Sequence, residues 1–522
     1  MNDENAYNLI DEPWIPVLMQ DGTNRHVSLG DVFADVGGSI ADLALNPYER
    51  ISVFRLLLCI AQAALGMERV KNERAWLSIK DLVGPISTEY LNHWHNRFFL
   101  YGPHAFLQIN CLVAGNKSAS TSKLVLHFAS GNASTLFDHE ARVIQHRPMT
   151  NSDTVRSLLT YLNYSAAGGS PTCIWKGCST RHVGIPAAPC RGQSKLFTLL
   201  TGDSLLHSIW MNILTEKQLK DMRIKLGHPC WEYVFNNCET IEKETGLWLG
   251  SVDSAFRQIS EPSWLGVLVP LSRFVKLTPN NQECLICEGF GYPQAPFWRE
   301  PEATFFAAAE RDGTETIRCL RINPDKEPWR DLSSILEMGR SKGGAIALDH
   351  LSTLALSSST NLFSVWTGGV YSDADQDKDQ RPGEWRFSCP VSLLRKSSLD
   401  NYRTAVEWAS KQLFCRGSAR IPNMGLKAAV QKYSGQLLVD DVTRFSVPAE
   451  RIYWDILAKP EKQLLVREVA NDLSLLPKWK DSVRMAAEDA YRQICPSATA
   501  RQMEAFAQGF SKLTIREERN NE

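Results

Sequence analysis

One stretch constrains the fold more than any other. It reads ISVFRLLLCIAQAAL, from Ile51 to Leu65, and it is apolar nearly all the way round a helix. The preceding Asn46 and Pro47 start a helix, because asparagine caps helix N-termini and proline suits the first turn, and Gly66 ends it. A helix without a polar face is buried on every side. The sequence therefore predicts a central helix enclosed by other elements.

The bulk composition is that of an ordinary globular protein. The chain has 522 residues, 43% hydrophobic and 22% charged, enough for two to four domains with large cores. No apolar run reaches eighteen residues, and the acidic, polar N-terminus lacks a signal peptide's basic and apolar regions, so we expect a cytoplasmic protein without a membrane partner. We interpret the thirteen cysteines as reduced thiols packed as small apolar groups.

The first residues predict a β-hairpin. An apolar run, WIPVL from Trp14 to Leu18, is followed by the turn signal Asp21-Gly22 and by HVSL from His26. Pro16 has no backbone N–H to donate, so we expect its strand to lie at a sheet edge. Farther on, Asn151 or Ser152 caps a predicted helix that has Val155, Leu158, Leu159 and Leu162 on one apolar face.

The remaining patterns predict an α+β fold with two domains. Short apolar segments at 273–277, 284–287 and 316–322 indicate strands among helices, and we place a large mixed α/β domain at residues 1–390. Beyond it, helical periodicity and short connections predict an antiparallel four-helix bundle at 391–522. The apolar helix positions there are Tyr402, Ala405, Val406, Ala409 and Leu413 in one helix and Met503, Phe506, Ala507 and Phe510 in the last. Pro448 suits the first turn of another helix.

Charge is unevenly distributed between these parts. Residues 391–522 hold 21 Lys and Arg against 16 Asp and Glu, a net charge of +5, whereas the whole chain has a net charge of −1. A mildly basic helical domain can meet phosphate, but a solvated helical surface has the same composition.

The common catalytic motifs are absent. The sequence has no phosphate-binding GxxxxGK[ST] loop, no GxSxG elbow and no HExxH pair. Asp138, His139 and Glu140 leave open a metal-dependent hydrolase, although adjacent residues in an extended loop rarely converge on one substrate atom. Cys284 and Cys287 have zinc-ligand spacing and could join Cys173 and Cys178, or they are ordinary packed residues of a short strand. We predict no cofactor and assign no metal ligand.

Three polar loops point instead to nucleic-acid binding. Phe137 follows SGNASTL in the first, Gly168 and Gly169 lie in the second, and Gln376 and Lys378 lie in the third, within YSDADQDKDQRPGE. Aromatic side chains can wedge between bases, glycine lets backbone approach closely, and glutamine can bond to base edges. Each loop taken alone is more often just a solvated surface.

Several segments together resemble one family. NLIDEPWIPVLMQDGTNRHVSL at 8–29 is similar to the N-terminal signature of the CasA family, the large subunit of type I-E CRISPR Cascade. LLLCIAQAAL at 56–65, SGNASTLFDHE at 130–140 and GDSLLHSIWMNIL at 202–214 follow in the family's order. The excursion after Gly369 and the closing helical bundle also fit.

The resemblance implies a non-catalytic subunit of a crRNA-guided antiviral complex. The family recognises the protospacer-adjacent motif (PAM) in double-stranded DNA, contacts the crRNA 5′ handle, helps to start unwinding and recruits the CRISPR helicase-nuclease. Its partners would be the other Cascade subunits, crRNA, target DNA and that nuclease. Because guide pairing reads most of the target, the protein need read only a short duplex element.

The family's functional positions transfer to particular residues here. The loop aromatic falls on Phe137, with Asp138 and His139 next; the glycine loop falls on Gly168 and Gly169; and the glutamine wedge falls on Gln376, with Lys378 nearby. The family's minor-groove lysine has no counterpart in GYPQAPFWREP, where Gln294 is the nearest polar residue. A metal-dependent hydrolase and a scaffold without PAM contact remain the alternatives.

Overall fold

The computed structural model of the chain describes fourteen stretches, and every structural statement below concerns them. They are residues 7–115, 118–126, 149–175, 178–180, 182–232, 263–278, 283–293, 298–309, 314–323, 325–337, 343–357, 361–372, 380–418 and 422–515. The chain divides into two compact units. Met1–Trp329 and Glu337–Cys389 form the first, and Arg330–Leu336 and Pro390–Glu522 form the second. The short α10 (Leu332–Ile335) thus belongs to the helical unit, although it lies far from that unit in sequence.

The predicted hairpin is confirmed, but its strand is not an edge. β1 (Ile15–Met19) pairs antiparallel with both β2 (Asn24–Val27) and β3 (Ile40–Leu43), in the order β2-β1-β3. The edge prediction was wrong because Pro16 lies one residue beyond the β1–β3 ladder, which begins at Val17. Its missing N–H interrupts no ladder bond there, while its carbonyl still accepts from the Ala44 N–H at 2.9 Å.

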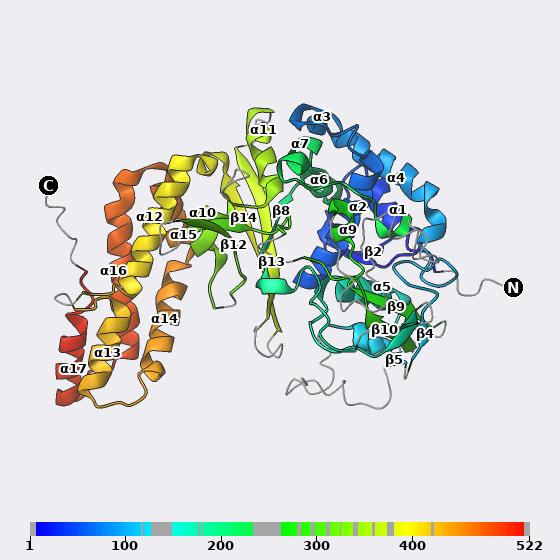
Figure 1. Cartoon of the computed structure of the whole chain (residues 1–522). Helices are drawn as coiled ribbons and strands as arrows, with labels where there is room; N and C mark the ends of the chain where they lie inside the picture. The colour runs from blue at the N-terminus through cyan, green and yellow to red at the C-terminus, as the bar shows by residue number, and fades with distance from the viewer. Residues whose placement is uncertain are drawn as a thin grey trace. The chain divides into compact units, whose positions relative to one another are not determined.

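The predicted central helix is confirmed as α2 (Pro47–Leu65). Asn46 caps it by accepting from the Glu49 N–H at 3.0 Å, Pro47 takes the first turn, and Gly66 ends it with φ +60°. Fifteen of its nineteen residues are buried, so no face remains for solvent. Around it pack α4 (Val83–His93), α5 (Asn151–Tyr164), α6 (Leu205–Met211) and α9 (Trp264–Leu268) (Figure 1).

Helix α5 has the predicted buried face but a different cap. Val155, Leu158, Leu159 and Leu162 are at most 1% exposed. The cap is Thr150, whose hydroxyl accepts from the Asp153 N–H at 3.1 Å, and it precedes both predicted positions, Asn151 and Ser152.

Four further small sheets complete the first unit (Figure 1). Their orders are β5-β10-β9, β4-β6-β7, β11-β12 and β14-β13-β8. The strands are β4 (Val113–Ala114), β5 (Ala119–Ser120), β6 (Cys173–Trp175), β7 (Cys178–Ser179), β8 (Phe197–Thr201), β9 (Arg273–Leu277), β10 (Glu283–Glu288), β11 (Phe305–Ala309), β12 (Glu315–Cys319), β13 (Leu362–Ser372) and β14 (Gln380–Pro390). The smaller helices are α1 (Leu29–Ala34), α3 (Glu73–Ser78), α7 (Glu216–Asp221) and α11 (His350–Ser357).

A buried cluster of charges lies in the core of the first unit. Lys195 Nζ is 2.5 Å and Arg55 Nη1 is 3.1 Å from the two carboxylate oxygens of Glu300, and all three side chains are at most 2% exposed. Although burial opposes ionisation, Lys195 and Arg55 hold the pKa of Glu300 below its ordinary value. Burial raises the pKa of the neighbouring Glu302. Buried charges of this kind persist only when paired.

The predicted α+β class with a helical C-terminal region is confirmed. The described part of that region has six α-helices, where the sequence predicted a bundle of four. They are α12 (Lys396–Leu413), α13 (Leu426–Gln436), α14 (Thr443–Leu457), α15 (Pro460–Asn471), α16 (Leu476–Ile494) and α17 (Ala500–Phe510). Two local breakers add segments: Gly425 precedes α13 with φ +93°, and Pro460 starts α15.

The helical faces follow the prediction in α12 but only partly in α17, where Phe506 and Phe510 pack on Tyr491 with ring centroids 4.9 and 6.0 Å away. All five predicted apolar positions of α12 are buried. On α17, Met503 is 55% exposed, and the buried residues are instead Ala505 and Gly509. A Cβ on Gly509 would lie 2.1 Å from the Tyr491 hydroxyl, so close packing against α16 sets this face. Pro448 lies inside α14 rather than in its first turn.

Among the described residues, no helix combines the length and the apolar character that crossing a bilayer requires.

Candidate nucleic-acid interface

The structure describes only part of the predicted site. Phe137, Asp138 and His139 lie outside the described residues, as do Gln376, Lys378 and Gln294. The described ends of the first loop are η3 (Thr121–Leu124) and α5, and those of the third are β13 and β14. Gly168 and Gly169 are described, and with them the turn that follows α5.

Gly168 and Gly169 form one side of a small antiparallel ribbon. Gly168 exchanges both backbone hydrogen bonds with Ile185, at 3.0 and 2.9 Å, and the Ser170 N–H donates to the His182 carbonyl at 3.0 Å. Gly169 lies between these bonds, so its own N–H points away from the partner segment. That N–H has no hydrogen bond to any described residue, and Gly169 is exposed. It is therefore available to an acceptor such as a phosphate or a base edge.

The backbone shape of this turn requires glycine at one position. Gly168 has φ +134°, in a region that other residues rarely adopt, although a Cβ there would meet no atom within 4 Å. A Cβ on Gly169 would lie 3.2 Å from the His182 carbonyl. We name residues 166–170 with 182–185 the glycine turn.

A buried arginine, which the sequence analysis missed, holds the glycine turn in place. Arg273 of β9 is 3% exposed and donates through Nη2 to the carbonyls of Ala166 and, at 3.0 Å, of Pro186. Burial lowers the pKa of this guanidinium. Within the strand sequence RFVKL nothing distinguishes Arg273 from an exposed edge residue, so no sequence signal could have identified it.

The predicted loops start from separate places in the fold. The first loop reaches α5 at its N-terminal end, and the glycine turn leaves α5 at its C-terminal end. A helix of fourteen residues spans about 21 Å at roughly 1.5 Å per residue, so α5 separates these two described ends. The third loop joins β13 and β14, which have eleven residues each. Of these two strands, β13 is the inner one, and it pairs with β8 in the register Val365↔Leu200.

Cys284 and Cys287 are not arranged to bind one zinc ion as a pair. Cys284 and Cys287 lie three residues apart on β10, whose register with β9 runs without a bulge from Cys284↔Leu277 to Cys287↔Phe274. Residues three apart on a regular strand point to opposite faces, so the two thiols cannot bind one ion together. Among the described residues, no three or more His, Cys, Asp and Glu side chains are grouped as metal ligands.

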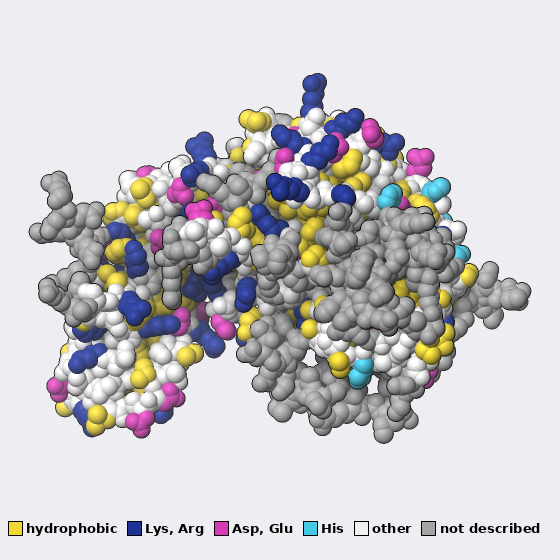
Figure 2. Space-filling model, in the orientation of Figure 1, with side chains coloured by type: hydrophobic (Ala, Val, Ile, Leu, Met, Phe, Trp, Pro, Cys, Tyr) yellow, Lys and Arg dark blue, Asp and Glu magenta, His cyan; other side chains and the backbone are white. Residues whose placement is uncertain are grey.

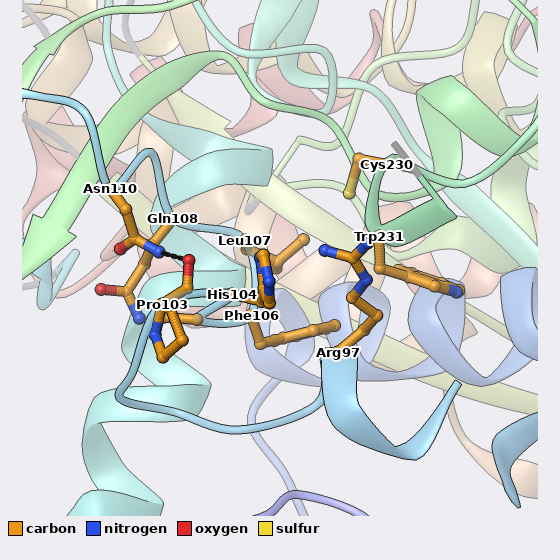
Figure 3. Close-up of a pocket in the computed structure, with 10 residues that line it drawn as sticks. Arg97, Pro103, His104, Phe106, Leu107, Gln108, Asn110, Cys230 and Trp231 are labelled. Carbon is orange, nitrogen blue, oxygen red and sulfur yellow. Dashed lines mark hydrogen bonds between the residues drawn. The ribbon is translucent and has the colours of Figure 1, made fainter. Parts of the chain in front are cut away.

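A small pocket lies near the end of α4. It is lined by Arg97, the loop 103–110 and the pair Cys230 and Trp231 (Figure 3). Leu107 takes a left-handed backbone with φ 57°, and Asn110 donates to the Pro103 carbonyl. The pocket measures about 30 Å³. A site of that size holds about one water molecule or two, so it is too small for a base.

On the face that Figure 2 shows, the described side chains of the helical unit form no single basic patch. Figure 2 shows lysine and arginine side chains scattered over its visible face among acidic and hydrophobic ones. Several are paired within one helix, as Arg484 is with Glu488 at 3.2 Å and with Asp481 at 3.3 Å. Such pairing is typical of a solvated helical surface.

The fold is that of the CasA and Cse1 proteins. CasA of Thermus thermophilus superposes with a TM-score of 0.71 at 22% identity, covering 97% of this chain and 98% of that one. Cse1 of Thermobifida fusca gives a TM-score of 0.74 at 17% identity, covering 98% and 99%. A chain of a structure described as a CRISPR RNA-guided surveillance complex gives 0.71 at 16% identity, covering 97% and 99%.

The family is shown by the sequence itself. The CRISPR-associated protein CasA/Cse1 of Thermus thermophilus is 27% identical over 530 residues, covering 96% of this chain and 95% of that relative. The family model of CRISPR-associated protein Cse1 matches residues 8–490. The chain belongs to this family, the large subunits of type I-E Cascade, as the resemblance had predicted.

Proposed function

We propose that this protein is the non-catalytic subunit of a crRNA-guided surveillance complex that reads the PAM in double-stranded DNA. In this role it contacts the crRNA 5′ handle, starts duplex opening and then recruits the helicase-nuclease. Family membership over residues 8–490 supports a place in such a complex. The proposal extends from that membership to the particular loops.

One structural observation carries the nucleic-acid contact. The exposed N–H of Gly169 has no described partner, on a turn whose Gly168 has no side chain to keep a strand away. Backbone N–H groups bind phosphate and base acceptors without needing a cationic side chain. This suits a near-neutral chain, of net charge −1, that draws most of its affinity from neighbouring protein and RNA.

We assign the contacts with the crRNA handle and with the PAM duplex to the residues that the sequence predicts for them. Phe137, Asp138 and His139 would meet the crRNA handle and the PAM region, and Gln376, with Lys378 nearby, would enter the duplex beside the PAM. Splitting a base step costs a few kcal/mol, which guide–target pairing returns once it begins. Minor-groove reading distinguishes base pairs poorly and so tolerates several PAMs.

A measurement of duplex opening distinguishes the proposed function from DNA binding without strand separation. We expect Gln376→Ala, in the reconstituted complex, to slow opening of a PAM-bearing duplex while leaving affinity for a pre-opened bubble unchanged. Gln431→Ala, an exposed glutamine of α13, is the matched control. Equal losses on duplex and bubble would contradict the wedge role. Binding of the reconstituted complex to a library of duplexes with varied PAM sequences then identifies the PAM that it recognises.

Enzymatic activity is tested separately on the purified chain. Incubation with duplex and single-stranded DNA and Mg²⁺ or Mn²⁺ should release no cleavage products. Turnover that Asp138→Ala abolishes would instead support a hydrolase. Crosslinking from positions 137 and 376 to DNA distinguishes the PAM reader from a scaffold, because a scaffold without PAM contact gives no crosslink.

A further inference from the structure

The base of the β13–β14 hairpin is tied to the N-terminal sheet through one carboxylate. Asp42 of β3 uses each oxygen for a different arginine: Oδ1 accepts from Arg50 of α2, and Oδ2 lies 2.6 Å from Nη2 of Arg386 on β14. Asp42 is 8% exposed and Arg50 is 2% exposed, whereas the side chain of Arg386 is 57% exposed. The carboxylate is thus a buried anchor that reaches the hairpin through an exposed arginine.

Aromatic packing continues this contact into the hairpin. The Arg50 guanidinium lies 5.2 Å from the ring centroid of the fully buried Trp366 on β13. The Trp366 indole N–H donates to Glu384 of β14 at 2.6 Å. Because Glu384 and Arg386 are two residues apart on one strand, both point to the same face of the hairpin. We name Asp42, Arg50, Trp366, Glu384 and Arg386 the hairpin clamp.

The other face of the hairpin rests on a fixed backbone atom. A Cβ on Gly369 would lie 2.4 Å from the carbonyl oxygen of Lys195, so only glycine allows this approach. Residue 369 is three positions from Trp366 and therefore faces away from it. Lys195 is itself 1% exposed and bonded to Glu300, so its carbonyl belongs to the rigid core. The hairpin is held on both faces.

We propose that these two contacts set the direction of the hairpin, and that Asp42, Arg386 and Gly369 are positioning residues for duplex opening. The inference rests on the proposed function, because β13 and β14 lead to the loop that holds Gln376. Gly369 lies three residues from the end of β13, about 10 Å at 3.3 Å per residue. A rotation of about 6° there displaces the strand end by roughly 1 Å, enough to cost about 100-fold in a positioned reaction.

Arg386 could instead contact a DNA phosphate directly, and the two roles predict different variants. Asp42→Asn weakens the clamp but leaves Arg386 free and charged, whereas Arg386→Gln removes both clamp and charge. Gly369→Ala moves the hairpin by steric contact without changing any charge. If these residues position the hairpin, all three variants impair opening. If Arg386 binds phosphate, only Arg386→Gln does.

The experiment uses the reconstituted complex and two probes. Opening of a PAM-bearing duplex is followed with 2-aminopurine beside the PAM, and affinity is measured for the same target with a pre-opened bubble. We expect Asp42→Asn, Arg386→Gln and Gly369→Ala each to slow opening about tenfold or more while bubble affinity stays within about twofold. The double variant Asp42→Asn with Arg386→Gln should be no slower than the slower single variant, because the pair acts as one unit.

Rescue and control variants separate positioning from folding. Arg386→Lys retains the charge and should recover part of the opening rate. Gly37→Ala is the matched glycine control, since a Cβ there meets no atom within 4 Å. Arg386 is largely exposed, so Arg386→Gln remains informative if Asp42→Asn or Gly369→Ala fails to fold.

Two outcomes would overturn the inference, and a third would overturn the proposed function but leave the clamp to be tested separately. Normal opening by Asp42→Asn and Gly369→Ala would overturn it, and so would an equal loss of bubble affinity in all variants. If Gln376→Ala opens DNA normally, the proposed function fails, and hydrogen exchange then tests the clamp by itself. Faster exchange at residues 364–370 in Asp42→Asn and Arg386→Gln supports the clamp, and unchanged exchange refutes it.

Discussion

His350 lies flat against the indole of Trp76, with ring centroids 4.0 Å apart and planes 3° apart. Trp76 in turn stacks on Trp210 at 4.3 Å, and these two tryptophans exchange indole-to-carbonyl hydrogen bonds at 3.1 and 2.9 Å. His350 is fully buried, and its ring nitrogens meet Glu73 Oε2 at 2.8 Å and the Ile213 carbonyl at 2.9 Å. The His350 ring thus links three parts of the first unit: α3, the segment that follows α6, and α11, to which His350 itself belongs.

Replacing His350 should therefore weaken the first unit. His350→Leu leaves the Ile213 carbonyl buried without its donor, which costs about 1–3 kcal/mol, and loses the stack on Trp76, about 0.5–1.5 kcal/mol more. We expect a loss of roughly 2–4 kcal/mol in the free energy of unfolding by urea. Glu73→Gln should cost less, because a glutamine amide can both donate and accept and so can still hydrogen-bond to the facing ring nitrogen of His350. A loss below about 0.5 kcal/mol for His350→Leu would contradict this account.

We expect substitution of Glu300 to destabilise the protein much more than substitution of an exposed charged residue. Glu300→Gln leaves Lys195 and Arg55 buried without their shared carboxylate, and breaking a buried pair in this way costs about 3–5 kcal/mol. Glu68→Gln is the control, because its ion pair with Lys71 is exposed and contributes about 0–1 kcal/mol. Chemical denaturation of both variants measures the difference. Similar losses would show that burial does not strengthen the pairing.

We expect the folded protein to lose stability toward acid pH because of His207. Burial, together with the nearby Lys80, lowers the pKa of His207 below its ordinary value of 6.5. The unfolded chain therefore binds a proton that the folded chain resists, so stability falls as pH drops below about 6.5. His207→Phe keeps a ring against Trp210 and removes the titration. Thermal unfolding between pH 7.5 and 5.5 should show a shallower decline in the variant, and identical declines would refute the prediction.

Gly168 should tolerate no side chain. Gly168→Ala has room for its Cβ but must adopt φ +134°, a strain of about 1–3 kcal/mol. We expect the glycine turn to shift or fray, with faster hydrogen exchange at the Ile185 N–H and weaker binding of PAM-bearing DNA by the complex. Gly37→Ala again serves as the control. Normal exchange together with normal affinity would show that the turn accommodates alanine.

The two cysteines of β10 should hold no metal together. Cys284→Ser and wild-type protein should contain equal zinc after purification, because the two thiols of this strand face opposite sides of the sheet. The measurement is the zinc released on denaturation, detected with a chromogenic chelator. Loss of one equivalent of zinc in Cys284→Ser would contradict the strand geometry.

Local sequence determined the features that depend on neighbours along the chain. Asn46, Pro47 and Gly66 delimit α2, because caps and breakers act on the residues beside them. The hairpin at Asp21-Gly22 and the buried face of α12 follow from turn chemistry and helical period in the same way. The family resemblance also rested on sequence order alone.

Only tertiary structure decided which faces and charges meet. The face of α17 depends on how closely Gly509 approaches Tyr491, and the central place of β1 depends on a third strand roughly twenty residues away. Lys195 and Glu300 are 105 residues apart, and Asp42 meets Arg386 across most of the first unit's sequence. Such pairs have no periodicity to reveal them, because long-range packing brings them together only after the local elements have formed.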